Sequence, residues 1–519
     1  MSQMGGLKSA SARAVLLILI AAGIVLRAVG LEWGVPAALP PEATPYRNSF
    51  HFDEDNYLWG LTHIDSKRWN FDVQDLHWGT LQFYLVGAAL QVAESSGYLT
   101  RPWKEAFLAW DPVNFPRVYH VGRLVSAISG TLSLWVVFLV GKRLRDTETG
   151  LLACAFLAVT PLHVLNSHYL TSDITMVFLS LTAFYFFLVS LDSNDLKAHL
   201  LSGLFLGLAI AAKYNAAYLL PLWLGRDLIE RKSSWKLKVW GYGAMVAGFA
   251  LGEPYALLRP GEFVRVIYHA HVLDTPEMRL FLIPWPQLLA AQGKALLNFG
   301  VQWPLASLAA IGLLVSVARP TKKTLWFAAA VLLAAGSIAG SKWPMIRYTL
   351  PVVPLIALAA ALALTAARIR ESWRPWIYVL ALCIPLLSSW MQTMILVREH
   401  PARSAARWVA ANVTDGSRIG QIWTKLPPLD RQRYDVHQLH GIFGHDAEDS
   451  QDRDRQFLIL DNLPLQPFSP SFAGRLAREY DLVAEFRSDP RIGRWTFPEV
   501  DAPHDWKYTH PVVGIYRRK

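Results

Sequence analysis

The stretch RVYHVGRLVSAISGTLSLWVVFLVGKRL, residues 117–144, decides how this chain folds. It carries no charged residue from 124 to 141, and a helix needs about 20 such residues to cross a bilayer. The stretch ends in Lys142 and Arg143, and basic residues beside a span mark the cytoplasmic side of a membrane. We therefore predict a membrane-spanning helix over 118–141 that is followed by a cytoplasmic loop.

The composition of the whole chain also favours a membrane protein. Of the 519 residues, 53% are hydrophobic and only 17% are charged, whereas a soluble domain is about 25% charged. The formal net charge of +10 would suit a nucleic-acid partner. The basic residues lie in short loops between apolar runs, however, as determinants of membrane topology do. We expect membrane lipids as partners, and no nucleic acid.

The apolar runs predict about eleven transmembrane helices. They cover 14–31, 118–141, 150–165, 171–191, 198–212, 214–226, 239–257, 296–317, 325–341, 348–366 and 376–396. The run 77–93 is shorter and contains Gln, His and Gly. We predict that it forms an interfacial or re-entrant helix rather than a span.

The positive-inside rule supports this count and gives the orientation. With a cytoplasmic N-terminus, the loops on the inside are 141–149, 191–197, 226–238, 318–324 and 366–375, and these loops hold basic residues. If 77–93 were a span, they would lie outside, against the rule. The prediction is an all-α polytopic membrane domain over 1–396, whose first outer loop, 32–117, carries juxtamembrane helices.

The tail 397–519 is much more polar and is expected to form a small extracytoplasmic α/β domain. PARSAARWVAANV (401–413) has the periodicity of an amphipathic helix. Strands are predicted at SRIGQIW (417–423), QFLILD (456–461), DLVAEF (481–486) and VVGIYRR (512–518). From its location alone, we expect this domain to help select an acceptor.

Acidic residues at the outer ends of the spans are candidates for function, because a charge there is costly unless it is paired or hydrated. Asp53, Glu54 and Asp55 lie in FHFDEDNYLWG (50–60), and Asp173 begins a later span. A carboxylate near a hydroxyl can act as a general base, and a second acid can raise its pKa or hold a cation. The alternative is that these acids only favour the first turn of a helix.

Cations are predicted on the same side of the membrane. Lys213 lies between two apolar runs, and Lys342 and Arg347 flank a Trp-Pro turn that is followed by Tyr348. A guanidinium fork suits a pair of phosphate oxygens. The alternative is interfacial anchoring or snorkelling. Together the acids and cations predict a site for an anionic headgroup, such as that of a lipid phosphate.

Arg123 lies inside the start of a span, where it needs a partner such as an acid of the first loop or Asp173. Arg117, His77 and His168 are further candidates on the outer side.

These residues lie in motifs that resemble the GT-C glycosyltransferases of family 39, the protein O-mannosyltransferase and aminoarabinose-transferase type. The resemblance covers about residues 1–370, and the order of the motifs carries it. They are FHFDEDNYLWG (50–60), HWGTLQFYL (77–85), RVYHVGRLVSAISGTLSLWVVFLVGKRL (117–144), LLACAFLAVTPLHVLNSHYLTSDITMVFLSLTAFYFF (151–187), AAKYNAAYLLPL (211–222) and RYTLPVVPLIALAAAL (347–362).

The resemblance implies an inverting glycosyltransferase that moves a sugar from a polyprenyl-phosphate carrier to an acceptor hydroxyl on the outer face. It implies that Asp53 is the catalytic base, with Glu54 beside it, and that Asp173 is the acid of the second outer loop. Basic residues at span ends would hold the carrier phosphate, which gives Lys213, Arg347 and Arg123, with Lys342 and Tyr348 beside them. A divalent cation, Mg or Mn, is an optional cofactor, and Asp53, Glu54 and Asp173 would hold it.

The sequence departs from parts of that group. HWGT at 77–80 replaces a proline-rich segment, which argues against an aminoarabinose donor or a lipid A acceptor. The tail has no β-trefoil pattern of the kind found in eukaryotic protein mannosyltransferases, which favours a bacterial or archaeal enzyme. We expect a bacterial one, in the cytoplasmic (inner) plasma membrane. The acceptor would be a glycan, a lipid or a protein. The alternative function is a secondary transporter or a flippase for lipid-linked sugars.

Overall fold

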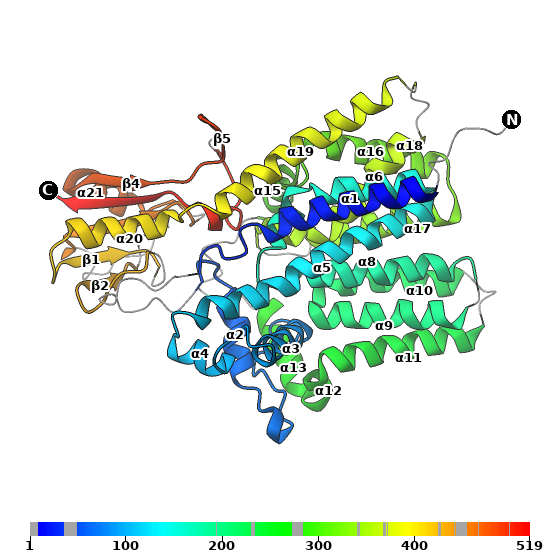
Figure 1. Cartoon of the computed structure of the whole chain (residues 1–519), viewed down its shortest axis with the longest axis horizontal. Coiled ribbons are helices and arrows are strands. Elements are labelled where there is room, and N and C mark those ends of the chain that lie inside the picture. Colours follow the sequence, from blue (N-terminus) through cyan, green and yellow to red (C-terminus); the bar gives the residue numbers. More distant parts are fainter. Residues whose placement is uncertain are drawn as a thin grey trace.

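The computed structural model describes residues 9–35, 49–193, 195–229, 234–271, 284–339, 343–366, 370, 372–423, 427–440, 442, 454–464, 467–497 and 499–519. A long helical bundle carries a smaller α/β domain at one end, and the C-terminal residues build that domain (Figure 1). We call this the site end of the bundle.

Each of the eleven predicted spans overlaps a helix. They are α1 (Ser9–Ala28), α5 (Asn114–Leu144), α6 (Thr147–Ala158), α8 (Asp173–Ser190), α9 (Leu196–Ala212), α10 (Leu220–Ile229), α11 (Trp235–Gly252), α16 (Trp303–Ala318), α17 (Lys322–Ala339), α18 (Val353–Ala366) and α19 (Arg374–Leu396). In the described part of the chain, five helices are long and apolar enough to cross a membrane, or six if the bent pair 286–300 and 303–318 is one span. The number eleven stays a prediction.

Several helices are short because the chain breaks near the site end. Pro161 begins α7 (Pro161–Asn166), and Pro254 begins α12 (Pro254–Leu258), which precedes α13 (Pro260–His271). The 3-10 segments η2 (Tyr214–Leu219) and η4 (Ile346–Val352) precede α10 and α18. Proline is tolerated in a first turn, where its missing N–H would have no partner. α15 (Trp285–Ala295) and η3 (Leu296–Gly300) lead into α16.

Small residues bring α9 and α11 into close contact. A Cβ atom on Gly203 would lie 1.9 Å from the carbonyl oxygen of Gly241, and one on Gly207 would lie 2.0 Å from that of Met245. Glycine therefore permits an approach of the two backbones that any side chain would block, which is a common device in membrane helix pairs.

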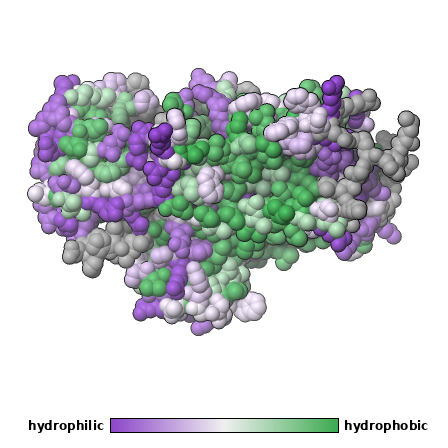
Figure 2. All heavy atoms as spheres, turned by 45° about the horizontal axis from the view of Figure 1, so that its top comes forward, coloured by the Kyte–Doolittle hydropathy of each residue, from purple (hydrophilic) through white to green (hydrophobic). Residues whose placement is uncertain are grey.

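The loops predicted to lie inside meet at the end of the bundle opposite to the site end. Asp192 is 2.7 Å from Arg143 and 2.7 Å from Lys323, so it joins three of these loops. Arg374 lies 3.7 Å from Glu148 and joins a fourth. The surface between the two ends is hydrophobic and is bounded by hydrophilic surfaces (Figure 2), as expected of a protein whose middle faces lipid.

The first outer loop forms α2 (Glu54–Thr62), η1 (Ser66–Arg68), α3 (Leu81–Ser95) and α4 (Trp103–Ala109). The predicted interfacial helix at 77–93 is α3. It is seen nearly end-on in Figure 1 while the bundle helices run across the view. α3 therefore runs across the direction of the bundle helices. This is the direction of a helix that lies beside the end of the bundle, whereas a further span would run along the bundle.

The C-terminal domain has a five-stranded sheet of order β2-β1-β3-β7-β4. The strands are β1 (Arg418–Gln421), β2 (Asp435–Gln438), β3 (Phe457–Asp461), β4 (Tyr480–Phe486) and β7 (Val513–Arg518), with α20 (Pro401–Asn412) and α21 (Pro470–Glu479) as helices. β1 pairs parallel with β2 and β3, while β7 pairs antiparallel with β3 and β4. β5 (Arg491–Ile492) and β6 (Trp495–Thr496) form a small ribbon. The predicted helix and four strands are confirmed; β2 and α21 were not predicted.

Candidate active site

Two ion pairs form the centre of the candidate site. The Nζ atom of Lys213 lies 2.6 Å from Oδ1 of Asp173, and Nη2 of Arg347 lies 2.9 Å from Oδ2 of Asp53. The sequence placed all four residues on one side of the membrane, and the structure brings them together in pairs. Each pair joins a predicted catalytic acid to a predicted phosphate ligand.

The ring of Tyr348 connects the two pairs. Lys213 Nζ is 5.3 Å from the ring centroid, and the guanidinium carbon of Arg347 is 5.7 Å from it. A cation over an aromatic face is attracted by the negative face of the ring. Tyr348 therefore helps to hold both cations beside one another.

Helix ends set the positions of these groups. Asp173 is the first residue of α8, where the helix dipole favours a negative charge. Lys213 follows α9 with extended backbone and donates its N–H to Ala209. Arg347 is the second residue of η4, and Asp53 immediately precedes α2. The site is thus built from four breaks in helical structure.

Glu54 is the partner that Arg123 needed. Arg123 donates from Nε to Oε1 at 2.8 Å and from Nη2 to Oε2 at 2.6 Å, and both side chains are 0% exposed. The backbone N–H of Leu170 and the hydroxyl of Ser49 also donate to Glu54. This arrangement suits a cross-link between the first loop, α5 and the chain before α8 better than the catalytic or phosphate-binding roles predicted for Glu54 and Arg123.

Two tyrosines extend this anchoring. Tyr119 donates to Asp55 at 2.6 Å, and the backbone N–H of Ser49 donates to the same oxygen. The hydroxyl of Tyr57 lies 3.0 Å from Oγ of Ser172 and accepts the Ser172 N–H at 3.1 Å. Tyr57 therefore ties α2 to the start of α8, beside Asp173. Sequence reasoning missed Tyr57, because a tyrosine next to three acids gives no separate signal.

The backbone of Asp53 is held by His51. The Asp53 N–H donates to Nδ1 of His51 at 3.2 Å. Burial lowers the pKa of His51 to about 4, so the ring is neutral at physiological pH and its Nδ1 can accept. The side chain of Asp53 remains 24% exposed, which leaves it more accessible than Glu54.

The other predicted residues lie apart from the paired charges. His77 pairs with Asp75 at 3.2 Å on the surface. His168 is buried against the carbonyl oxygens of Val164 and Val29. Arg117 donates to the carbonyl of Tyr98 at 2.8 Å. Lys342 lies outside the described residues.

The optional divalent cation would need Asp53, Glu54 and Asp173 as its ligands. Within the described ranges, no three acidic, histidine or cysteine side chains come together as metal ligands. Both oxygens of Glu54 are bound by Arg123, and one oxygen of Asp173 is bound by Lys213. Hard cations need several oxygen ligands, and Glu54 offers none in this arrangement.

Glu253 is a buried acid that sequence reasoning missed. It follows α11 and accepts from the N–H of Thr80 at 2.8 Å and from the hydroxyl of Tyr214 at 3.0 Å. It thereby fastens the chain before α3 to the residue after Lys213. The criterion that selected Lys213, a charge at the end of an apolar run, would have found it.

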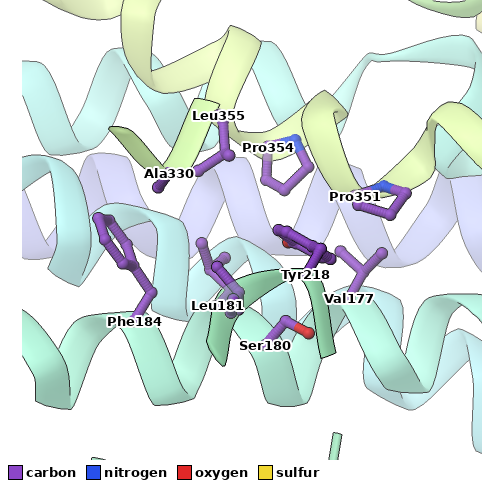
Figure 3. Close-up of a pocket in the computed structure, with 10 residues that line it drawn as sticks. Val177, Ser180, Leu181, Phe184, Tyr218, Ala330, Pro351, Pro354 and Leu355 are labelled. Atoms are coloured by element: carbon purple, nitrogen blue, oxygen red, sulfur yellow. The ribbon is translucent and has the colours of Figure 1, made fainter. Parts of the chain in front are cut away.

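A small pocket lies between the elements that carry the paired charges. Val177, Leu181 and Phe184 of α8 face Pro351 and Pro354, with Leu355, Tyr218 and Ala330 completing the wall (Figure 3). Because α8, η2 and η4 start at or beside Asp173, Lys213 and Arg347, the same three elements line both the charged cluster and this mainly apolar pocket.

Part of the chain matches a known protein family. A family model described as "Dolichyl-phosphate-mannose-protein mannosyltransferase" matches residues 117–257, a range that contains Asp173 and Lys213 but neither Asp53 nor Arg347. No curated protein sequence matches the chain.

Solved structures of membrane glycosyltransferases share the fold. ArnT from Cupriavidus metallidurans in the apo state is 13% identical with a TM-score of 0.52, over 97% of this chain and 98% of that one. The same protein bound to undecaprenyl phosphate gives a TM-score of 0.50 at 13% identity, over 96% and 97%.

The Archaeoglobus fulgidus oligosaccharyltransferase tethered with an acceptor peptide containing the NVT sequon is 14% identical with a TM-score of 0.53. The alignment covers 82% of this chain and 64% of that enzyme, so the chain spans less than two thirds of its length. The resemblance to GT-C glycosyltransferases of the protein O-mannosyltransferase and aminoarabinose-transferase type is confirmed. At these identities the structural similarity establishes the fold.

Proposed function

We propose that this protein is an inverting glycosyltransferase that moves a sugar from a polyprenyl-phosphate carrier to an acceptor hydroxyl. The observation that carries the proposal is the pairing of Lys213 and Arg347 with Asp173 and Asp53 at one end of an apolar bundle. Two cations at the end of an apolar bundle suit a lipid phosphate, and an accessible acid beside them suits a general base.

The paired charges account for how the carrier would bind. The two acids balance the two cations, so the cluster carries no excess charge before the substrate arrives. A phosphodiester supplies a negative charge of its own and would replace the carboxylates as the partner of Lys213 and Arg347. This exchange releases an oxygen of Asp53 from Arg347 at the moment when the acceptor needs a base.

The transfer step then uses Asp53 and the two cations. Asp53 takes the proton of the acceptor hydroxyl as its oxygen bonds to the anomeric carbon. The bond between that carbon and the phosphate oxygen breaks, and its electron pair leaves with the polyprenyl phosphate. Attack from the side opposite to the leaving group inverts the anomeric centre. Lys213 and Arg347 stabilise the charge that develops on the phosphate, as preorganised cations do in a dry site.

The loops that meet at Asp192 support an orientation with the site end outside. Their basic residues would lie in the cytoplasm, and the site end and the C-terminal domain would then lie on the other side of the membrane. We infer a bacterial protein of family 39 type in the cytoplasmic membrane. The related ArnT structure holds undecaprenyl phosphate, and this supports a polyprenyl-phosphate donor; glycan, lipid and protein acceptors are all compatible with the site. A transporter or flippase would place its ionisable groups near the midplane, whereas these gather at one end.

A transfer assay in membranes tests the function. Polyprenyl-phosphate sugars, mannose first, are supplied to wild type and to Asp53→Asn, and the release of free polyprenyl phosphate is measured. We expect release by wild type and a loss of about 100-fold or more in the variant, which is the typical contribution of a general base. Asp65→Asn, in the same loop, is the matched control.

A measurement of undecaprenyl phosphate binding separates a loss of catalysis from a loss of carrier recognition. Asp53→Asn should still bind undecaprenyl phosphate, since Lys213 and Arg347 remain. Transfer at the wild-type rate by Asp53→Asn would rule out Asp53 as the base. Failure of wild type to release polyprenyl phosphate from any lipid-linked sugar would overturn the proposed function.

A further inference from the structure

A segment of the C-terminal domain, His504–Tyr508, reaches into the membrane part of the protein. The side chain of Trp506 is fully buried, and its ring lies 5.7 Å from that of Phe299 in η3. The segment is therefore packed against the membrane part, although it belongs to a domain that is otherwise separate in sequence.

Asp505 binds the backbone of Arg347. Its Oδ1 accepts the N–H of Ile346 at 2.9 Å, and its Oδ2 accepts the N–H of Arg347 at 3.1 Å. These are the first two residues of η4, and the residue before them, Met345, has an apolar side chain. A carboxylate at the start of a helical turn satisfies N–H groups that have no partner within the turn. Here that carboxylate comes from another domain.

Tyr508 contacts the loop that carries Asp53. Its ring centroid lies 5.1 Å from that of Phe52 and 5.2 Å from that of His51. His51 in turn accepts the backbone N–H of Asp53. The same five-residue segment therefore binds the chain on both sides of the ion pair between Asp53 and Arg347.

We propose that His504–Tyr508 is a built-in part of the active site and that Asp505 is a positioning residue, which fixes Arg347 for the carrier phosphate. The inference rests on the proposed function and assigns the C-terminal domain a role in donor binding, in addition to the acceptor selection expected from its location. Asp505 acts through the backbone of Arg347 and touches no substrate.

The test is a double-mutant cycle on carrier binding. Purified full-length protein in detergent is titrated with undecaprenyl phosphate, for wild type, Asp505→Ala, Arg347→Ala and the double variant. We expect Asp505→Ala to weaken binding about tenfold, the scale of hydrogen bonds that involve a charged group. In the Arg347→Ala background the same change should weaken binding less than about twofold, because the group that Asp505 positions is gone.

Asp501→Asn is the matched control, because Asp501 lies in the same part of the domain but pairs with exposed Lys294 at 3.0 Å; it should bind as wild type does. Asp505→Asn keeps one acceptor oxygen and should lose less than Asp505→Ala. Equal losses in both backgrounds, or no loss at all, would overturn the role of Asp505. Wild type that binds no undecaprenyl phosphate would instead refute the proposed function.

Discussion

The loss of the negative charge should lower the free energy of unfolding much more at Glu54 than at the neighbouring Asp53. Glu54 receives two hydrogen bonds from Arg123, one from the N–H of Leu170 and one from Ser49, with no exposure to solvent. Glu54→Gln leaves the guanidinium buried without a counter-charge and turns amide hydrogens toward its donors. Breaking a buried pair in this way costs about 3–5 kcal/mol.

Thermal unfolding in detergent, followed by tryptophan fluorescence, measures this loss. Asp53→Asn is the matched control and should lower the free energy of unfolding by less than Glu54→Gln does, because the side chain of Asp53 is 24% exposed and that of Glu54 is 0% exposed. Unfolding of Glu54→Gln within about 1 kcal/mol of wild type, or an equal loss in Asp53→Asn, would refute the reasoning.

The pH dependence of unfolding gives a second reading of the same pair. Burial alone would raise the pKa of Glu54, but the charge and hydrogen bonds of Arg123 hold it below its ordinary value of 4.5. A lowered pKa stabilises the folded state above that ordinary value, and this stabilisation is lost as the pH falls through the folded-state pKa. The stability of wild type should therefore fall more steeply in acid than that of Glu54→Gln.

Two other changes test separate features. Lys213→Ala should weaken the binding of undecaprenyl phosphate about tenfold, while Lys236→Ala at the opposite end should not; equal affinities for both variants would contradict a phosphate role. Gly203→Val should lower the free energy of unfolding by about 1–3 kcal/mol through overpacking. Gly243→Val should leave it unchanged, because a Cβ atom on Gly243 would meet no atom within 4 Å.

The helices and strands followed from local patterns, because apolar runs and alternation are properties of a short stretch of chain. The same holds for the gathering of Asp53, Asp173, Lys213 and Arg347 at one end, which needed only the alternation of loops. Which acid meets which cation was beyond the sequence, since the pairing depends on how the helices pack.

The different roles of adjacent residues could not be predicted from the sequence either. Asp53 and Glu54 look alike in sequence, yet one is turned toward Arg347 and the other toward Arg123. Asp505 gave no signal at all, because its contact with Arg347 crosses from one domain to another. Glu253, in contrast, was within reach of the rule that found Lys213.

The residues around the ion pair between Asp53 and Arg347 lie far apart along the chain, and this has a consequence for its synthesis. Asp53 emerges from the ribosome first, Arg347 much later, and Tyr508 later still. At about 5–20 residues per second, roughly 20 to 90 s separate the first of these from the last. The surroundings of the ion pair between Asp53 and Arg347 therefore cannot be complete before Tyr508 has been made, and a chain that terminates earlier would lack the contacts of Asp505 and Tyr508 with them.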